Sequence, residues 1–351
     1  MNKFERNHHK NGILLQILII LFLTFLMIAT AAYNPRKSCT IFTAVYDEEV
    51  YYGNSEDQHN PDPVIGFFPP SSEGFGSVHF GIRNEDGQVN FEGAVNDQGL
   101  AWDVNSTPKT KLNPVSDMDK PYYLGDDNYL SRITKEAATV EEAIQIAEMY
   151  HFGETMESQI HIADANGDAV VISGGPDSEI AFTRKGPGKG YHLSTNFNLA
   201  QPEKGPVDFR WETARSMLDA LEEGQSLTHT YAVEILNAVK LKTLTSYSLY
   251  SNVLDLKNNK IHLTYMSQFD ETVEIDLDKE ISKGERVVEM REFFNPETAK
   301  AGDAAYQRFA VRFMFAKIIV MMVLFLMIIG VLYWSFRARE RKQYQTINIK
   351  Q

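Results

Sequence analysis

Residues 39–57 read CTIFTAVYDEEVYYGNSED and open the long segment between the two apolar ends of the chain. Apolar and polar residues alternate through 39–46, acidic residues follow at 47–49, and 50–53 is again mostly apolar. Two such runs around a short polar turn predict a β-hairpin. The stretch therefore predicts an antiparallel sheet whose first strand starts at Cys39.

Cys39 is the only cysteine among 351 residues. A single cysteine excludes an intramolecular disulfide framework and a site built from several thiolates. It lies seven residues beyond Ala32, where an apolar leader ends in small residues. Processing at this place would make Cys39 the first residue, so we predict an N-terminal nucleophile. A small buried hydrophobe is the alternative for a lone cysteine.

The amino-terminal leader has the composition of an export signal. Residues 12–32 carry no charge and follow Lys3, Arg6 and Lys10. About 20 apolar residues also suffice to span a bilayer, so 1–32 is predicted to be a signal peptide or a signal anchor. The small-x-small triplet at 29–31 favours cleavage. Residues 33–38 would then be a short propeptide.

The carboxyl-terminal end has the pattern of a stop-transfer helix. Residues 318–334 carry no charge, and Arg337, Arg339, Arg341 and Lys342 follow. The sequence predicts a transmembrane helix over 318–335 with a basic cytoplasmic tail over 336–351. The acidic segment from Glu280 to about Asp303 is expected to be a stalk, which continues over 301–317. A buried helix of a soluble domain is the alternative.

These two ends predict a single-pass protein of the cell membrane, with its main domain on the extracytoplasmic side and the lipid bilayer as a partner. About 270 residues remain between the ends, which favours one large core. The net charge of −13 argues against a nucleic-acid-binding surface, so nucleic acid is not expected as a partner. The nine histidines form no HExxH motif, so no metal and no cofactor are expected. The oligomeric state is not predicted.

The remaining elements are predicted from periodicity and turn residues. A capping box at Thr139 and Glu142 starts a helix that runs to about His151. Antiparallel blocks of strands with helices between them favour an α+β layered domain. Strands are expected at 77–82, 90–95, 100–104, 159–164, 169–173, 191–195, 246–256, 260–265 and 272–275, helices from about 129 and over 139–151, 209–221 and 230–241, and loops at 61–70 and 108–121.

Three motifs follow Cys39 at characteristic distances. They are Gly53-Asn54-Ser55-Glu56-Asp57, the stretch GAVNDQGLAWDVN over 93–105, and Ser194-Thr195-Asn196-Phe197. Their order and spacing resemble the choloylglycine hydrolase and penicillin V acylase family of N-terminal nucleophile hydrolases, with isopenicillin N acyltransferase and acid ceramidase as kin. The resemblance covers roughly residues 39–290.

The resemblance implies a four-layer αββα sandwich over 39–300 and hydrolysis of linear amide C–N bonds. Substrates would be N-acyl amides or compounds like bile salts or penicillin V. Acyl transfer to an amine, as in isopenicillin N acyltransferase, would use the same residues. A membrane-tethered binding domain that keeps the fold without the chemistry is the alternative from another class.

By position, the resemblance assigns five site residues. Cys39 matches the nucleophile, and Asp57 matches the acid that orients the α-amine and the thiol. Asn105 matches the side-chain donor of the oxyanion hole, and Asn196 matches a second active-site amide. Arg210 matches a later Arg-aromatic element. The free α-amine would itself serve as the base, because its pKa is near 8.

One position departs from the family pattern. Many members carry Arg directly after the hairpin glycine, where this chain has Asn54. A guanidinium there would favour the thiolate. Without a guanidinium at position 54, either Arg210 supplies the positive charge, or the substrate specificity differs, or the activity is reduced.

Some readings of single residues stay open at this point. A cysteine–histidine dyad would use His79, His161 or His192. Asn105-Ser106-Thr107 is a formal glycosylation sequon, and a buried oxyanion donor could not carry a glycan. Aromatic residues in predicted loops would line an apolar acyl pocket or belong to the core: Phe67, Phe68, Trp102, Tyr122 and Tyr123.

Overall fold

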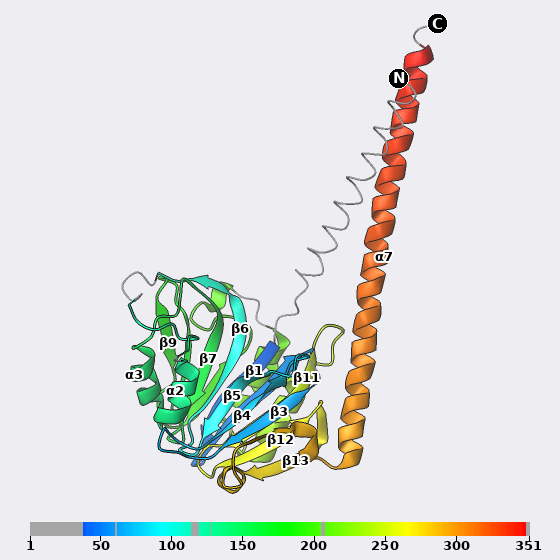
Figure 1. Cartoon of the computed structure of the whole chain (residues 1–351). Helices are drawn as coiled ribbons and strands as arrows, with labels where there is room; N and C mark the ends of the chain where they lie inside the picture. Colours follow the sequence, from blue (N-terminus) through cyan, green and yellow to red (C-terminus); the bar gives the residue numbers. More distant parts are fainter. Residues whose placement is uncertain (1–37, 60–61, 114–118, 127, 205–207, 349–351) are drawn as a thin grey trace. The chain divides into compact units, whose positions relative to one another are not determined.

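The computed structural model describes residues 38–59, 62–113, 119–126, 128–204 and 208–348, with side chains through residue 337. The predicted leader at 1–32 and nearly all of the segment 33–38 lie outside the described residues. One compact unit of the chain runs from Arg36 to Phe309. This domain contains every strand (Figure 1).

The first sheet is antiparallel throughout and has β1, the strand of Cys39, in its interior. Its order is β10-β1-β2-β11-β12-β13. Its strands are β1 (Ser38–Tyr46), β2 (Glu49–Gln58), β10 (Gly190–Ser194), β11 (Tyr247–Asp255), β12 (Lys260–Tyr265) and β13 (Gln268–Asp276).

The predicted hairpin of β1 and β2 is confirmed, with a turn one residue shorter than expected. Asp47 and Glu48 form this turn with φ values of 50° and 70°. Two central residues with positive φ match the right-handed twist of the flanking strands. The turn sets a register that pairs Val45 with Val50 and Cys39 with Glu56.

The second sheet is also antiparallel, in the order β14-β3-β4-β5-β6-β7-β8-β9. Its strands are β3 (Pro63–Phe68), β4 (Ser77–Arg83), β5 (Val89–Asn96), β6 (Ala101–Lys111), β7 (Thr155–Ala163), β8 (Ala169–Gly174), β9 (Ile180–Arg184) and β14 (Arg286–Glu289).

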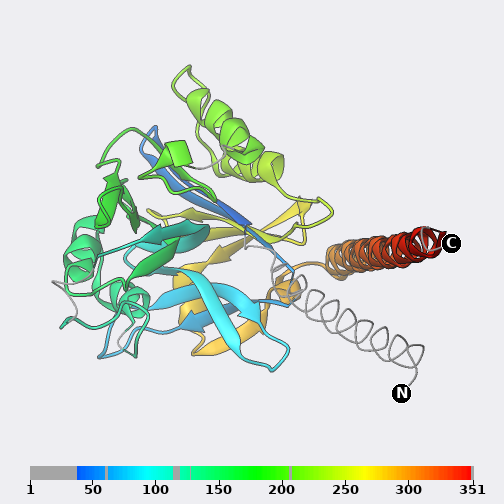
Figure 2. The same cartoon turned by 90° about the horizontal axis from the view of Figure 1, so that it is seen from above.

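Two helix pairs cover the outer faces of the sheets (Figure 2). Helices α2 (Tyr129–Glu136) and α3 (Val140–Ala147) share a buried core with strands of the eight-stranded sheet. Helices α4 (Phe209–Asp219) and α5 (His229–Val239) share another with the six-stranded sheet. The predicted capping box of Thr139 and Glu142 starts α3. The shorter elements are η1 (Pro202–Lys204), α6 (Leu277–Ile281) and η2 (Met290–Phe293).

The inner faces of the sheets pack on each other. The Tyr52 hydroxyl donates to the backbone oxygen of His161 at 3.1 Å, and the Phe80 and Tyr250 rings stack at 6.4 Å. Face-to-face packing of two antiparallel sheets forms the central core of a sandwich. The domain is therefore the predicted four-layer αββα sandwich of the α+β class.

Two predicted loops contain strands. Strand β3 lies within 61–70, and β6 continues to Lys111 within 108–121. Both strands tolerate proline because Pro63 is the first residue of β3 and Pro108 lies where the pairing of β6 with β7 shifts register. Strand β9 was not predicted, and its side chains are at most half-buried.

The prediction of a stalk over 280–303 is wrong for its central part. Strand β14 pairs with β3 at the edge of the second sheet. Helix α7 (Pro296–Asn348) then begins within the domain. The Tyr306 hydroxyl donates to the backbone oxygen of His59, and the Phe309 ring stacks on the His59 ring at 5.8 Å. The domain therefore extends past residue 300 to Phe309.

The later part of α7 is long and apolar enough to cross a membrane. Its stretch Pro296–Arg337 contains an 18-residue window with a mean hydropathy of 2.8, none of which is buried. Val331 and Trp334 are 70% and 77% exposed. Large apolar side chains that stay exposed along a helix are typical of a surface made for contact with lipid or protein.

Candidate active site

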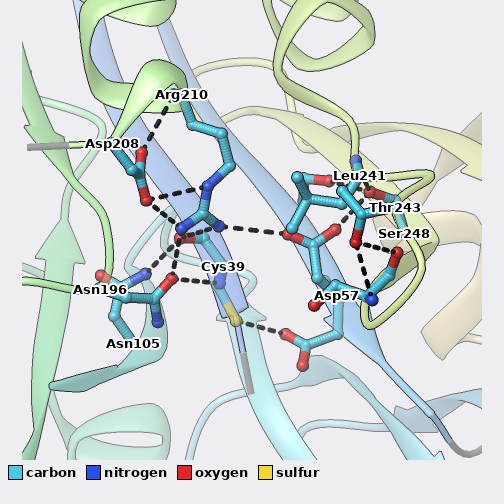
Figure 3. Close-up of polar contacts among 12 residues, drawn as sticks. Cys39, Asp57, Asn105, Asn196, Asp208, Arg210, Leu241, Thr243 and Ser248 are labelled. Carbon is cyan, nitrogen blue, oxygen red and sulfur yellow. Dashed lines mark hydrogen bonds and ion pairs between the residues drawn. The ribbon is translucent and has the colours of Figure 1, made fainter. Parts of the chain in front are cut away.

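The start of β1 holds Cys39 by its backbone. Its N–H donates to Oδ1 of Asn196 at 3.1 Å. Its backbone oxygen accepts from Nδ2 of Asn105 at 3.2 Å and from Nη1 of Arg210 at 3.4 Å. Three of the predicted site residues therefore contact the nucleophile candidate directly (Figure 3).

Arg210 links the other predicted residues. It lies in the first turn of α4, whose N-cap is Asp208, and is only 4% exposed. Its guanidinium donates to Asn196 at 2.8 Å and to Asp57 at 3.3 Å, and it pairs with Asp208. In Figure 3 it lies between Asp208 and Asn196 on one side and Asp57 on the other.

Asp57 reaches the cysteine only through Arg210. Its carboxylate accepts from Arg210 and from the Ser248 hydroxyl, while the Cys39 nitrogen donates to Asn196. The direct contact with the cysteine nitrogen that the resemblance implied is thus not made in this structure. Burial raises the pKa of Asp57 to about 8 and outweighs the opposing effect of Arg210.

Glu56 contacts the thiol, and the sequence analysis gave it no role. The Cys39 thiol donates to Oε2 of Glu56 at 3.1 Å, and the Gln58 side chain donates to Oε1 at 2.6 Å. Glu56 is 1% exposed. The available signal was the hairpin register, because a two-residue turn at 47–48 places residue 56 opposite residue 39.

The surroundings of the thiol favour its neutral form. Burial raises the pKa of the Cys39 thiol well above its usual value, and the charges of Glu56, Asp103 and Asp57 raise it further. Asn54, which replaces the family arginine, donates to Asp103 at 2.7 Å. At neutral pH the structure therefore favours a thiol over a thiolate at Cys39.

The two active-site amides are fixed by further bonds. Oδ1 of Asn105 accepts from the Ser194 hydroxyl at 2.7 Å, and Nδ2 of Asn196 donates to the backbone oxygen of Ser106 at 2.9 Å. Asn105 is 0% exposed. The folded domain has no room for a glycan at this asparagine. Asn105 is therefore not a glycosylation site in the folded domain.

The three candidate dyad histidines are bonded elsewhere. The His161 ring contacts Thr43 and Ser194 hydroxyls at 3.0 and 2.9 Å, His192 contacts the backbone oxygen of Thr183, and His79 contacts Ser77. Because the Cys39 thiol donates to a carboxylate, the dyad is wrong for this structure. Within the described residues, no group of three or more histidine, cysteine, aspartate or glutamate side chains could hold a metal ion.

Most of the candidate pocket aromatics belong to the core. Phe67, Trp102 and Tyr123 are at most 5% exposed. Phe68 is half-buried and packs edge-on to His79. Tyr122 is 40% exposed. The structure therefore assigns the first three to packing and leaves only Tyr122 well exposed.

The described domain thus combines two packed antiparallel sheets, helix pairs on their outer faces and a cysteine at the start of an inner strand. Two solved variants of the conjugated bile acid hydrolase from Clostridium perfringens are similar in structure. One has a TM-score of 0.50 and 14% sequence identity over 73% of this chain and 97% of that chain. The other has a TM-score of 0.49 and 13% sequence identity over 72% of this chain and 96% of that chain. The first likeness confirms the predicted fold class and the predicted structural resemblance.

No protein-family model matches the sequence, and no curated protein is significantly similar to it.

Proposed function

We propose that the protein is a membrane-anchored, extracytoplasmic hydrolase of linear amide C–N bonds with Cys39 as its N-terminal nucleophile. The observation that carries the proposal is the way Cys39 is held. Asn196 binds its nitrogen, Asn105 and Arg210 bind its oxygen, and Glu56 binds its sulfur. Buried backbone groups need partners in any residue, but here polar side chains from distant parts of the chain supply them, and the thiol itself donates to a carboxylate.

Removal of residues 1–38 would convert the held amide nitrogen into an α-amine. Such an amine takes the thiol proton, directly or through water. Once protonated, it also places a positive charge beside the sulfur, which lowers the thiol pKa that the surrounding carboxylates raise. Processing would therefore convert a neutral, unreactive thiol into a nucleophile. This activation needs neither a histidine base nor an arginine at position 54.

The sulfur then attacks the amide carbonyl of a substrate. Asn105 and a backbone N–H stabilise the oxyanion, and the ammonium of Cys39 protonates the leaving nitrogen. Water next hydrolyses the acyl enzyme and restores the thiol. Arg210 holds Asn196, the Cys39 oxygen and Asp57 in one arrangement, so that the amine stays aimed at the sulfur.

Membrane anchoring rests on α7. Its apolar window is exposed, and basic residues Arg337 and Arg339 follow it. Basic residues after a span favour the cytoplasmic side. The domain before α7 would then lie outside the cytoplasm, on a single-pass protein of the cell membrane.

The mature chain from native membranes is expected to start at Cys39. Terminal sequencing and intact mass measure this start, and one equivalent of an alkylating agent on the lone thiol checks its identity. A mature chain that starts at Tyr33 or Met1 contradicts the proposal.

Replacing Asn105 with alanine should lower kcat by about 10²–10³-fold with little change in KM, as for other oxyanion donors. Hydrolysis of a panel of N-acyl amides by the mature protein measures the effect. Asn113→Ala is the matched control, because Asn113 is exposed. Equal losses in both variants would argue against an oxyanion role.

A binding domain without chemistry is the second candidate. The acidic, fully buried setting of the thiol favours it. This candidate predicts that the same amides bind without turnover and that the chain keeps the Ser38–Cys39 bond.

A further inference from the structure

A second cavity lies between α5 and the six-stranded sheet, at strands β12 and β13, with β12 three strands away from β1. Its volume is about 460 Å³, which is within the range of known small-molecule sites. Thr230, Val233, Glu234 and Asn237 of α5 line it at spacings of three and four, so they share one face of the helix. None of its lining residues belongs to the candidate active site.

The lining of this cavity contains a buried histidine without a hydrogen bond. His262, on β12, is 6% exposed, and its ring nitrogens have no hydrogen-bond partner in the part of the chain that the structure describes. Burial lowers the pKa of His262, so at pH 7 the ring is neutral and one nitrogen can accept a hydrogen bond. Buried polar groups normally have partners, and a ligand in the cavity could supply this one.

Two carboxylates make the cavity electronegative. Glu234 on α5 and Glu274 on β13 both line it and are both exposed. Neither accepts a hydrogen bond from the described residues. Glu274 lies directly opposite His262 in the register of β12 and β13, and Asp255 adds a further negative charge near this ring. The cavity therefore offers several acceptors close together.

The wall of the cavity already contacts one ammonium group. Lys240 donates to Oδ1 of Asn237, and its Nζ lies 5.3 Å from the centre of the Phe269 ring. An ammonium over an aromatic ring is attracted by the ring face. The other lysine near His262 is Lys260, whose charge is offset by its pair with Asp276. The lining thus suits a positive charge next to an apolar surface.

We propose that this cavity binds an organic cation, namely a primary amine on an apolar body. The ammonium would donate to His262 and to the two carboxylates, as charge-assisted hydrogen bonds. The apolar body would pack on Val233 and Phe269. This site is separate from the candidate active site, and the proposal does not depend on the proposed function.

The chemistry of the lining argues against two other ligands. An anion would meet the two carboxylates at close range and be repelled. A metal ion would need nitrogen lone pairs that converge on one point. The His229 and His262 rings are instead stacked at 4.3 Å, with 8° between their planes, so their in-plane lone pairs run nearly parallel.

The test is calorimetric titration of the full chain in detergent micelles with 2-phenylethylamine, with empty micelles as the blank. Binding should saturate at one amine per chain. Two probes of similar shape, neutral 2-phenylethanol and anionic 3-phenylpropionate, should bind at least about 10-fold more weakly, because they lack the charged donor. An amine that does not saturate, or an alcohol that binds equally well, overturns the proposal. Zinc chloride that saturates the site in place of the amine also overturns it.

Variants locate the bound amine. The double variant Glu234→Gln and Glu274→Gln should weaken amine binding at least about 10-fold, and His262→Phe, which keeps a stacked ring but removes the acceptor, should also weaken it. Asp270→Asn is the matched control, because it removes an exposed charge from β13 outside the lining and should bind as the wild type does.

Thermal unfolding checks that each variant is folded. If His262→Phe is unfolded, the glutamate variants decide, since both of their side chains are exposed. Unchanged affinity in the folded double variant would place the amine elsewhere and overturn the proposal, as would an equal loss in Asp270→Asn. The readout is binding and not turnover, so a negative result leaves the proposed function standing.

Discussion

Replacing Cys39 with alanine abolishes amide hydrolysis, with an expected loss of at least about 10³–10⁴-fold in kcat/KM, as for other nucleophile deletions. The reason is that the proposed acyl enzyme forms on the thiol of Cys39, which alanine lacks. The measurement is turnover of N-acyl amides by the purified protein, and full activity in Cys39→Ala would refute the scheme.

The alanine variant could also fail to mature, so a second measurement separates loss of the nucleophile from loss of maturation. Mature wild-type protein is treated with iodoacetamide, which can label only Cys39 because the chain has one cysteine. Turnover should fall in proportion to the label and reach zero at one label per chain. Activity that survives complete labelling would show that the thiol is not the attacking group.

Replacing Arg210 with methionine should destabilise the domain by about 3 kcal/mol. The guanidinium is buried and donates to Asp208, Asn196 and the Cys39 oxygen, and its removal leaves buried acceptors without a donor, at about 1–3 kcal/mol each. Thermal and urea unfolding measure the change. Arg215→Met is the matched control on the same helix, since its pair with Asp219 is exposed and worth little.

The same variant should change how stability depends on pH. Burial raises the pKa of Asp57 from 3.8, the ordinary value of an aspartate, to about 8 in the folded domain. Between these values the native state binds more protons than the unfolded state, so stability falls as pH rises, by at most about 1.4 kcal/mol per pH unit. Arg210 lowers the folded pKa, and its loss should extend the fall to higher pH. Asp57→Asn should remove this contribution; an unchanged pH profile in both variants would contradict it.

The motifs predicted which side chains lie next to Cys39. Cys39, Asn105, Asn196 and Arg210 meet as the resemblance implied, because their order along the chain fixes their places in the sandwich. Ser248 was not predictable in this way. It contacts Asp57 from 191 residues away, and only the pairing of β11 with β2 brings it there.

The sequence patterns did not predict two strands that lie at the edges of the second sheet. Strands β9 and β14 are short and mostly half-exposed or exposed, so they lack the clean alternation that predicts a half-buried strand. The acidic residues between 280 and 303 led to the prediction of a stalk. The apolar Met290 and Phe294 among them are buried, and they mark the segment as part of the core.

The first turns of α7 set the boundary for a shortened chain that keeps the whole domain and omits the apolar part of the helix. Phe309 and Tyr306 cover Tyr247 at ring distances of 5.3 and 5.7 Å, and Tyr247 precedes Ser248, the partner of Asp57. A truncation at residue 295 would remove both rings and expose the start of β11, next to the Ser248 that contacts Asp57. A stop placed in 310–317 would keep that cover and omit the apolar window, so protein engineers seeking crystals should cut there.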